Sequence, residues 1–446
     1  MTKHILVIGG GAAGIGAARQ LRKRNLRVTL VERNDELGGR GRTYFWEGGW
    51  RIWGAAAYVG GEPDMVGLAT ELGMADDPSI QRIPEEVNYD TIHPELGFVE
   101  ATVSPGKLMF SKVLPFGEKL RLAGVLPTII AAKSRAADED PASLSKYDNI
   151  SACAFLRRYS PALVDYIIEP MMQQYFGYGE DDFSLAWLLW TMSSPNIGSE
   201  LPWRYEDRGV GQLFHEAERH LRADPGCSLN LRMDAIQLDI GANKVSLRAA
   251  TSGIDQIIEA DGAVIAVPGT LVNSLVPGLD RERKAFFGSV QYVAHHVMHF
   301  KVSRPTSPLP ASLLLPTAMG FRRVSNAWVH DHDDEHVRIH LEIKGAFGAE
   351  TEEWDDDRIL DACWNEVTKA LPPLNEVRMA NRILLRNHIG LCRRHVGYTT
   401  ALGKFRALAP LARAAFAGDY MANSTLGRSY RSGVSAADQV IATCNT

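Results

Sequence analysis

The sequence predicts an α/β fold, with a parallel sheet and flanking helices in one domain and helices plus a mixed β-sheet in another. Three observations carry this prediction. A strand, a glycine-rich turn, a helix and a second strand follow one another from residue 5 to residue 32. A further strand-like run surrounds residue 264, and a strand, a Gly-Asp turn and a helix close the chain. The stretches between these segments have helical and strand-like patterns of their own, which indicates a second domain inserted in pieces.

The N-terminal segment has the order of a dinucleotide-binding βαβ unit of Rossmann type. Ile5–Ile8 is a short apolar run, and the turn Gly9-Gly10-Gly11-Ala12-Ala13-Gly14 follows it directly. The next stretch, 15–26, predicts a helix, and Val28–Val31 predicts a second strand that ends at Glu32.

The glycines and the acidic residue of such a unit each have a physical role. Gly9 permits a tight turn, Gly11 lets a pyrophosphate approach the backbone, and Gly14 lets the helix pack close to the sheet. Glu32 can accept hydrogen bonds from a ribose, and the helix N-terminus offers N–H groups to phosphates. The alternative is a sheet whose glycine turn serves packing alone.

A second glycine turn indicates which dinucleotide is bound. The segment 35–43 contains Gly38-Gly39-Arg40 and then Arg42, and here the chain resembles the flavoprotein family of amine oxidases, protoporphyrinogen oxidases and phytoene desaturases. The resemblance implies that Arg33, Gly39, Arg40 and Arg42 belong to a site for FAD, since glycines admit the diphosphate and an arginine fork matches its oxygens. The alternative is a plain loop with a solvated arginine.

Two distant segments extend the resemblance over the chain. Ala260–Pro268 resembles the family's strand that returns to the nucleotide domain, and Ala415–Tyr420 resembles its Gly-Asp turn. The resemblance implies that Gly418 and Asp419 face the ribityl–pyrophosphate part of FAD and that the closing segment, with Leu426, approaches the flavin.

The resemblance also implies three further backbone contacts with FAD. Gly54 and Ala55 lie in a tryptophan-rich segment that passes close to the flavin in the family, and Ala235 lies against the adenine. For Ala235 a simple edge strand is the open alternative.

The chain departs from the family pattern in ways that affect the chemistry. The closing segment 423–433 has no cysteine, so we expect non-covalent FAD. A lysine common in amine oxidases is replaced by His295 in the expected strand 293–300, and a shift of one residue would place His296 there. His295 and Tyr398 are the candidate catalytic residues. For His295 the alternative is a histidine with only a structural role in a β-strand.

No metal site is expected. The segment His330–His336 has metal-ligand residue types, but it lies between two strand-like runs and has the composition of a solvated hairpin turn.

Bulk properties exclude several classes of protein. The net charge of −5 and the absence of a basic run argue against nucleic-acid binding. The five cysteines are an odd number without CxxC spacing, which favours a reducing compartment, and we expect a cytoplasmic protein. The sequence contains no run of eighteen apolar residues, so we expect no transmembrane helix.

We expect a discontinuous FAD-binding domain and a substrate domain. The FAD-binding domain is predicted at 1–80, 205–285 and 385–446, and the substrate domain at 81–204 and 286–384. In the former, strands at 228–231, 235–240 and 244–249 should form a meander.

The predicted substrate domain carries two segments with open alternatives. The stretch 103–133 is apolar with scattered basic residues, and Pro115 and Pro127 should divide it into short helices. It could touch a membrane surface weakly, as the corresponding region does in protoporphyrinogen oxidases, or form a core-facing helix pair. The aromatic and methionine residues of 166–192 could line an apolar pocket or belong to the core.

The function predicted from these features is that of an FAD-dependent oxidoreductase. It would remove two hydrogens from a C–N or C–C bond of an apolar or ring-bearing biosynthetic intermediate, with a hydride passing to flavin N5 and O₂ or another acceptor reoxidising the flavin. A flavin-dependent isomerase or mutase and a non-catalytic binding protein, such as the Rab GDP-dissociation inhibitors, are the alternatives. Assembly as a homodimer is left open.

Overall fold

The computed structural model describes residues 2–54, 63–74, 80–82, 89–102, 105–133, 141–193, 203–205, 210–422 and 425–444. The chain divides into two compact units, which comprise 1–85, 195–291 and 401–446 in the first and 86–194 and 292–400 in the second. The last segment of the first unit begins later than the predicted residue 385, because the strands at 379–385 and 391–392 pair within the second unit.

The first unit is built on a parallel five-stranded sheet in the order β21-β13-β1-β2-β9. In that order the strands are β21 (Ala414–Phe416), β13 (Gly262–Ile265), β1 (His4–Ile8), β2 (Arg27–Val31) and β9 (Cys227–Asn230). The pairing brings together the three segments that the sequence analysis connected.

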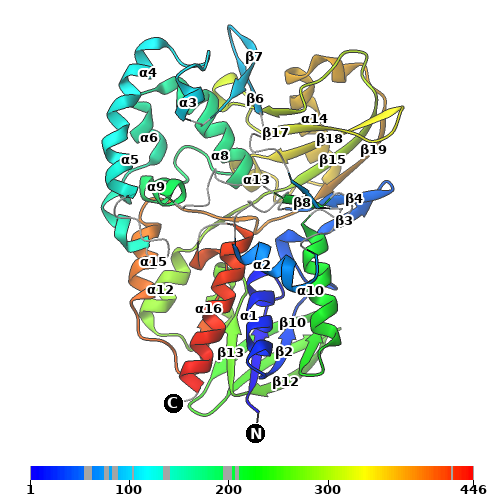
Figure 1. Cartoon of the computed structure of the whole chain (residues 1–446). Coiled ribbons are helices and arrows are strands. Elements are labelled where there is room, and N and C mark those ends of the chain that lie inside the picture. Colours follow the sequence, from blue (N-terminus) through cyan, green and yellow to red (C-terminus); the bar gives the residue numbers. More distant parts are fainter. Residues whose placement is uncertain are drawn as a thin grey trace. The chain divides into compact units, whose positions relative to one another are not determined.

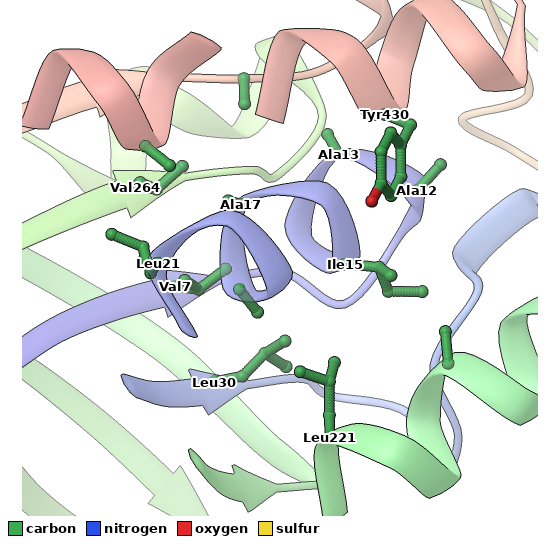
Figure 2. Close-up of a cluster of buried hydrophobic side chains, with 14 of the residues drawn as sticks. Val7, Ala12, Ala13, Ile15, Ala17, Leu21, Leu30, Leu221, Val264 and Tyr430 are labelled. Carbon is green, nitrogen blue, oxygen red and sulfur yellow. The ribbon is translucent and has the colours of Figure 1, made fainter. Parts of the chain in front are cut away.

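Four helices that belong to the same unit as this sheet share its core, and two of them, α1 (Ala12–Lys23) and α16 (Leu426–Cys444), approach each other closely. The other two are α2 (Pro63–Glu71) and α10 (Gly211–Ala223). Figure 2 shows the buried side chains between α1, the sheet and the neighbouring helices, with Ala13, Ala17 and Tyr430 among them. A Cβ on Gly433 would lie 1.8 Å from the Ala13 carbonyl oxygen, so α16 can approach α1 only because this residue is glycine.

A separate antiparallel meander completes the strand structure of this unit and corrects one prediction. It consists of β10 (Met233–Ile240), β11 (Val245–Thr251) and β12 (Ile254–Ala260). The strand predicted at 228–231 was assigned to the meander, but β9 pairs in parallel with β2. An alternating pattern reveals a strand and not its partner, which explains the wrong assignment.

The remaining elements of the first unit are short. They are η1 (Gly39–Gly41), β3 (Thr43–Trp46), β4 (Gly49–Ile52), β5 (Ile80–Arg82), β8 (Trp203–Tyr205), α11 (Gly269–Leu275), α12 (Arg281–Ser289) and η7 (Asp419–Met421). Helix α15 (Tyr398–Arg406) begins in the second unit and ends in the first.

The second unit contains a mixed seven-stranded sheet in the order β19-β15-β18-β17-β16-β6-β7 (Figure 1). Its strands are β19 (Met379–Leu385), β15 (Val297–Ser303), β18 (His336–Ile343), β17 (Val324–Asp331), β16 (Ser312–Leu314), β6 (Tyr89–His93) and β7 (Gly97–Ala101). Two short strands pair separately from this sheet: β14 (Tyr292–Val293), which precedes β15, and β20 (Leu391–Cys392), which follows β19. The strand predicted at 293–300 is therefore split, with residues 294–296 between β14 and β15.

One face of this sheet is apolar and covered by a helix. Leu313, Ala327, Leu341 and Met298 are register partners on neighbouring strands and share a core cluster with residues of α14 (Asp356–Ala370). The short helix α13 (Gly345–Glu350) and the turn η6 (Pro372–Asn375) adjoin it in sequence.

The other helices of the second unit come from its first chain segment. They are α3 (Pro105–Leu108), α4 (Phe116–Leu122), η2 (Ala123–Val125), α5 (Leu126–Lys133), η3 (Pro141–Tyr147), α6 (Ala152–Arg157), α7 (Pro161–Leu163), the π-helix η4 (Val164–Ile168), α8 (Glu169–Phe176) and α9 (Leu185–Ser193), while η5 (Thr317–Met319) follows β16. Pro115 precedes α4 as predicted, whereas Pro127 lies in the first turn of α5, where its missing N–H costs nothing.

The fold bears on two predicted alternatives. The segment His330–His336 forms the β17–β18 hairpin connection, in which the Asp333 carboxylate accepts the backbone N–H groups of Glu335 and His336. Tyr178, Phe183 and Trp187 are almost fully buried in a core cluster, where the Tyr178 and Phe183 rings stack and the Trp187 ring meets Phe183 edge-on, which favours the core role for these aromatic residues. No helix in the described part of the chain is long and apolar enough to span a bilayer.

Candidate cofactor site and active site

The first glycine turn has the shape that a phosphate-binding turn requires. Gly9 has φ +103°, and a Cβ there would lie 2.5 Å from the Ala266 carbonyl oxygen. A Cβ on Gly14 would lie 1.8 Å from the Gly9 carbonyl oxygen, so the first turn of α1 packs directly on the strand. Both glycines are required by the fold itself.

Gly11 differs from its neighbours because the fold does not need it. It is the N-cap of α1 with φ −72° and ψ −174°, an extended conformation open to any residue, and a Cβ there would meet nothing within 4 Å. The space next to Gly11 lies at a helix N-terminus that has no side-chain cap. The first N–H groups of a helix have no intrahelical partner and carry partial positive charge, so this space suits a phosphate.

Glu32 lies at the end of β2 and holds the turn together. Its Oε2 accepts the Gly10 backbone N–H at 2.6 Å, and its Oε1 accepts the Asn34 backbone N–H at 2.9 Å and the Asn34 side-chain amide. A carboxylate has about four acceptor positions. The buried Glu32 carboxylate therefore keeps room for a ribose hydroxyl while it fixes the position of the glycine turn.

The second glycine turn packs against the first. Gly38 N–H donates to the Gly10 carbonyl at 2.8 Å, and a Cβ on Gly39, where φ is +54°, would lie 3.2 Å from the Gly11 Cα. Arg42 donates to the Gly39 carbonyl at 3.0 Å and lies over the Trp53 ring. Arg33 is exposed to solvent. The structure thus brings Gly39 and Gly11 together and holds Arg42 beside them.

Arg40 and Asp419, which are far apart in sequence, form an ion pair. Arg40 Nη1 lies 2.8 Å from Asp419 Oδ2, and Asp419 is 8% exposed. Gly418, with φ +149°, donates its N–H to Ser432 Oγ at 2.9 Å, which ties the Gly-Asp turn to α16. Arg40 was predicted at the diphosphate of FAD and Asp419 at its ribityl–pyrophosphate part, and the ion pair brings the two residues to one place.

The remaining predicted contacts lie in separate parts of the chain. A Cβ on Gly54 would lie 2.5 Å from the Arg40 carbonyl oxygen, so this backbone lies against the second glycine turn. Ala55 lies outside the described residues. Ala235 lies in β10 next to an irregularity in its pairing with β11, and Leu426 is the first residue of α16, half-buried against the core of the first unit.

His295 occupies a buried position in the second unit. It is 5% exposed, its Nε2 lies 3.8 Å from Glu342 Oε1, and its Nδ1 is buried without a hydrogen-bond partner among the described residues. His296 differs, because its Nδ1 accepts the Asn387 backbone N–H, and burial together with His388 lowers the pKa of His296 to about 3. His296 is therefore a neutral structural histidine at ordinary pH.

Glu342 is the centre of a polar cluster that sequence reasoning missed. Its Oε1 also lies 3.1 Å from His340 Nε2. Burial alone would raise the pKa of the Glu342 carboxyl, but the imidazoles of His295 and His340 lower it to about 2, so Glu342 is ionised. The alternation His340-x-Glu342-x-Lys344 at the end of a strand was the available sequence signal.

A second buried ion pair lies next to this cluster in sequence. Lys344 Nζ lies 2.6 Å from Thr317 Oγ1 and 3.5 Å from Glu169 Oε1, and both charged residues are 2–3% exposed. Thr317 Oγ1 also donates to Glu169 Oε1 at 2.7 Å. The pair joins α8, η5 and the end of β18.

Tyr398, the second candidate catalytic residue, is buried at the start of α15 with 1% exposure. The Arg394 guanidinium lies 4.8 Å from its ring centroid, and Cys392 Sγ lies 3.6 Å from its hydroxyl. The structure therefore places Tyr398 in a packed cluster with Arg394 and Cys392.

The residues of the first unit fit an FAD molecule. The open space at Gly11, the uncapped α1 N-terminus and the spare acceptor capacity of Glu32 match a pyrophosphate and a ribose. Arg40, Asp419 and the backbone of the second glycine turn lie in the same unit.

Comparison with known proteins supports the same interpretation. The model of the flavin containing amine oxidoreductase family matches residues 12–441. Protoporphyrinogen oxidase 2 of Arabidopsis thaliana is 28% identical over 174 residues, which cover 38% of this chain and 32% of that protein. The match thus spans about a third of that relative's length. The 15-cis-phytoene desaturase of Narcissus pseudonarcissus is 23% identical over 456 residues, 96% of this chain and 76% of the desaturase.

A solved structure of putrescine oxidase bound to putrescine superimposes with a TM-score of 0.77 over 99% of both chains at 16% identity. At this identity the likeness shows the fold, an α/β architecture with helices and a mixed sheet.

Proposed function

Because the chain belongs to the family of flavin-containing amine oxidoreductases, we propose that it binds FAD without a covalent link and oxidises a small molecule by removing two hydrogens. When bound, FAD supplies the acceptor for a hydride at its N5 atom, and O₂ or another oxidant restores it. The geometry at Gly11 carries the proposal, because that glycine has no structural need in the fold and faces open space at a helix N-terminus.

The residues that would hold FAD lie in the first unit. Gly11 and the α1 N-terminus would receive the diphosphate, Glu32 the ribose, and Arg40 with Asp419 the adjoining part of the molecule. Gly9 and Gly14 shape the turn, and Gly39, Arg42 and Gly54 shape the second turn beside it.

The non-covalent link is supported by the position of the thiols. The described residues of α16 carry Cys444, whose thiol donates to the Asp261 carbonyl at the far end of the helix from Leu426. We propose a cytoplasmic location, which the five free cysteines support. Acid precipitation should leave a yellow supernatant, whereas a yellow pellet would contradict a non-covalent link.

The first experiment is the visible spectrum of the purified protein before and after anaerobic addition of candidate amines, porphyrinogens and polyenes. Absorbance at about 450 nm that one class bleaches, with a product two hydrogens lighter, would support the oxidase proposal and name the substrate class. Bleaching without such a product would favour an isomerase or mutase. A colourless protein that takes up no added FAD would favour a binding protein.

We also propose that one face of the second unit contacts an anionic membrane surface. Along 109–130 the apolar side chains of Phe110 and Phe116 are 87% and 76% exposed, and several neighbours are more than half exposed: Met109, Leu120, Leu126 and Ile130. Monomeric proteins rarely expose so many large apolar side chains together. Lys112 and Lys119 lie within the same stretch, and each basic residue near an anionic surface contributes about 1 kcal/mol.

Vesicle flotation tests this second proposal. The protein should float with vesicles that contain anionic lipid and much less with neutral ones, and the double variant Phe110→Ser/Phe116→Ser should stay at the bottom. Ile254→Ser, at an exposed site in β12, is the matched control and should float like the parent. Equal flotation of the double variant would refute the proposed contact.

A further inference from the structure

Arg42 and Trp53 lie opposite each other at the base of the β3–β4 hairpin. The register of the hairpin pairs Thr43 with Ile52, and one step further the Trp53 backbone N–H donates to the Arg42 carbonyl at 3.3 Å. Cross-strand partners point to the same side of a hairpin, and the Arg42 guanidinium carbon lies 4.6 Å from the centre of the Trp53 ring. This distance is within the range of a cation–π interaction, for which tryptophan is the best aromatic partner.

The Trp53 ring is itself held by its neighbours. Tyr44 follows Arg42 by two residues, on the same side of the hairpin, and meets the Trp53 ring edge-on with the ring centres 6.2 Å apart. The backbone after Trp53 is fixed as well, because a Cβ on Gly54 would lie 2.5 Å from the Arg40 carbonyl oxygen. The ring is therefore a fixed platform for the guanidinium that lies over it.

The second glycine turn holds the stem of Arg42. The Arg42 Nε donates to the Gly39 carbonyl at 3.0 Å, and a Cβ on Gly38, where φ is +109°, would lie 3.2 Å from Arg42 Cγ. Gly38 forms a parallel bridge with Gly11, and a Cβ on Gly39 would lie 3.2 Å from the Gly11 Cα. Arg42 thus contacts the turn that itself lies against Gly11 and the α1 N-terminus.

The charge of Arg42 is available to a ligand, in contrast to that of Arg40. The Arg40 guanidinium is paired with the Asp419 carboxylate at 2.8 Å. Arg42 donates through its Nε to Gly39, and within the described residues its two Nη groups meet no acceptor. A guanidinium has five N–H donors, so four remain. Planar donors of this kind match the oxygens of a phosphate.

We propose that Trp53 is a positioning residue for the cofactor: its ring, together with the Gly39 carbonyl, holds the Arg42 guanidinium in one orientation for the diphosphate of FAD. The inference rests on the proposed function, because it requires that FAD binds. A long side chain that must be ordered when a ligand binds lowers the affinity. Trp53 orders Arg42 when the protein folds, so FAD meets a donor that is already in place.

Titration of apo-protein with FAD, followed by flavin fluorescence quenching, tests the two residues. Arg42→Ala should raise the Kd about 10–150-fold, the range expected for loss of charge-assisted hydrogen bonds. Trp53→Leu, which keeps an apolar side chain and removes the ring, should raise it about 2–13-fold, the cost of ordering one long side chain. Trp53→Phe, which keeps a ring, should lie between Trp53→Leu and the parent. A parent-like Kd for Trp53→Leu would overturn the proposal.

A double variant shows whether Trp53 acts through Arg42. If it does, Trp53→Leu causes no further rise in Kd once Arg42→Ala is present, because the side chain that Trp53 orients is gone. Losses of affinity that multiply in Trp53→Leu/Arg42→Ala would show that Trp53 supports the site by packing alone, and the proposal would fail.

Fluorinated tryptophans at position 53 separate the charge on the ring face from its shape. Each fluorine withdraws negative charge from the face and changes the shape little, so log Kd should rise steadily with the number of fluorines. The control is Trp354 in the second unit, whose ring centre lies 3.7 Å from the Arg358 guanidinium carbon. The same series at position 354 should leave the Kd unchanged. A Kd that does not depend on fluorination at position 53 would contradict the cation–π role.

Two smaller probes assign the effect to the diphosphate. ADP carries a diphosphate and adenosine does not, so in calorimetric titrations Trp53→Leu should weaken the binding of ADP and leave that of adenosine unchanged; an equal loss for both probes would refute the assignment. If the parent apo-protein binds neither FAD nor ADP, the proposed function fails together with this inference. If the parent binds FAD and Trp53→Leu binds it equally well, this inference alone fails.

Discussion

Replacing Gly11 by alanine should separate FAD binding from folding. The new Cβ meets no protein atom within 4 Å, and the backbone conformation of φ −72° and ψ −174° suits alanine. The lower entropy of the unfolded chain stabilises such a variant by about 0.4–1 kcal/mol, and alanine is a poorer N-cap than glycine by several tenths of a kcal/mol. The two effects nearly cancel, so apo-protein stability should change by less than about 1 kcal/mol.

The same methyl group should weaken FAD binding clearly. It fills the space in which a phosphate would approach the α1 N-terminus, and overpacking of this kind costs about 1–3 kcal/mol. Since 1.4 kcal/mol is a factor of ten, the Kd for FAD should rise about 5–150-fold. Titration of apo-protein with FAD, followed by flavin fluorescence quenching, measures this change, and thermal unfolding of the apo-protein measures stability.

Two glycine variants make the result interpretable. Gly67→Ala in α2, where a Cβ also meets nothing within 4 Å, should keep the parent's affinity. Gly14→Ala should lose both stability and FAD, because its Cβ would lie 1.8 Å from the Gly9 oxygen. A Gly11→Ala variant that binds FAD like the parent would refute the assignment of this space to the diphosphate.

Three further predictions follow from the buried polar groups. Glu32→Ala should lose FAD and destabilise the apo-protein by about 2–4 kcal/mol in urea, because it leaves the Gly10 and Asn34 N–H groups without an acceptor. Glu32→Gln should have a smaller effect, and an equal loss of stability in the two variants would contradict this account. Burial lowers the pKa of His296 from 6.5 to about 3, so the unfolded chain binds more protons than the folded one between these pH values. The stability of the protein should therefore fall as pH drops below 6.5. His296→Gln should flatten that part of a curve of Tm against pH, and an unchanged slope would exclude His296 as its source. Lys344→Met should cost about 3–5 kcal/mol, whereas Lys344→Met/Glu169→Leu should unfold in urea near the parent midpoint. A double variant much less stable than the parent would show that the ion pair is net stabilising.

Local motifs were predictable from the sequence because short-range geometry determines them. The positions of Gly9, Gly11 and Gly14 relative to β1 and α1 follow from spacing alone, and the structure has the predicted strand, turn and helix there. The Arg40–Asp419 ion pair itself was not predicted, but the resemblance assigned both residues to neighbouring parts of FAD.

Contacts that depend on strand register were not predictable in this way. The alternation over 340–344 shows that His340 and Glu342 share a face, but not that His295, just before β15, lies near Glu342 or that α14 covers the opposite face. The same limit explains why β9 was assigned to the wrong sheet. Its pattern of residues is compatible with either an antiparallel meander or an edge of the parallel sheet.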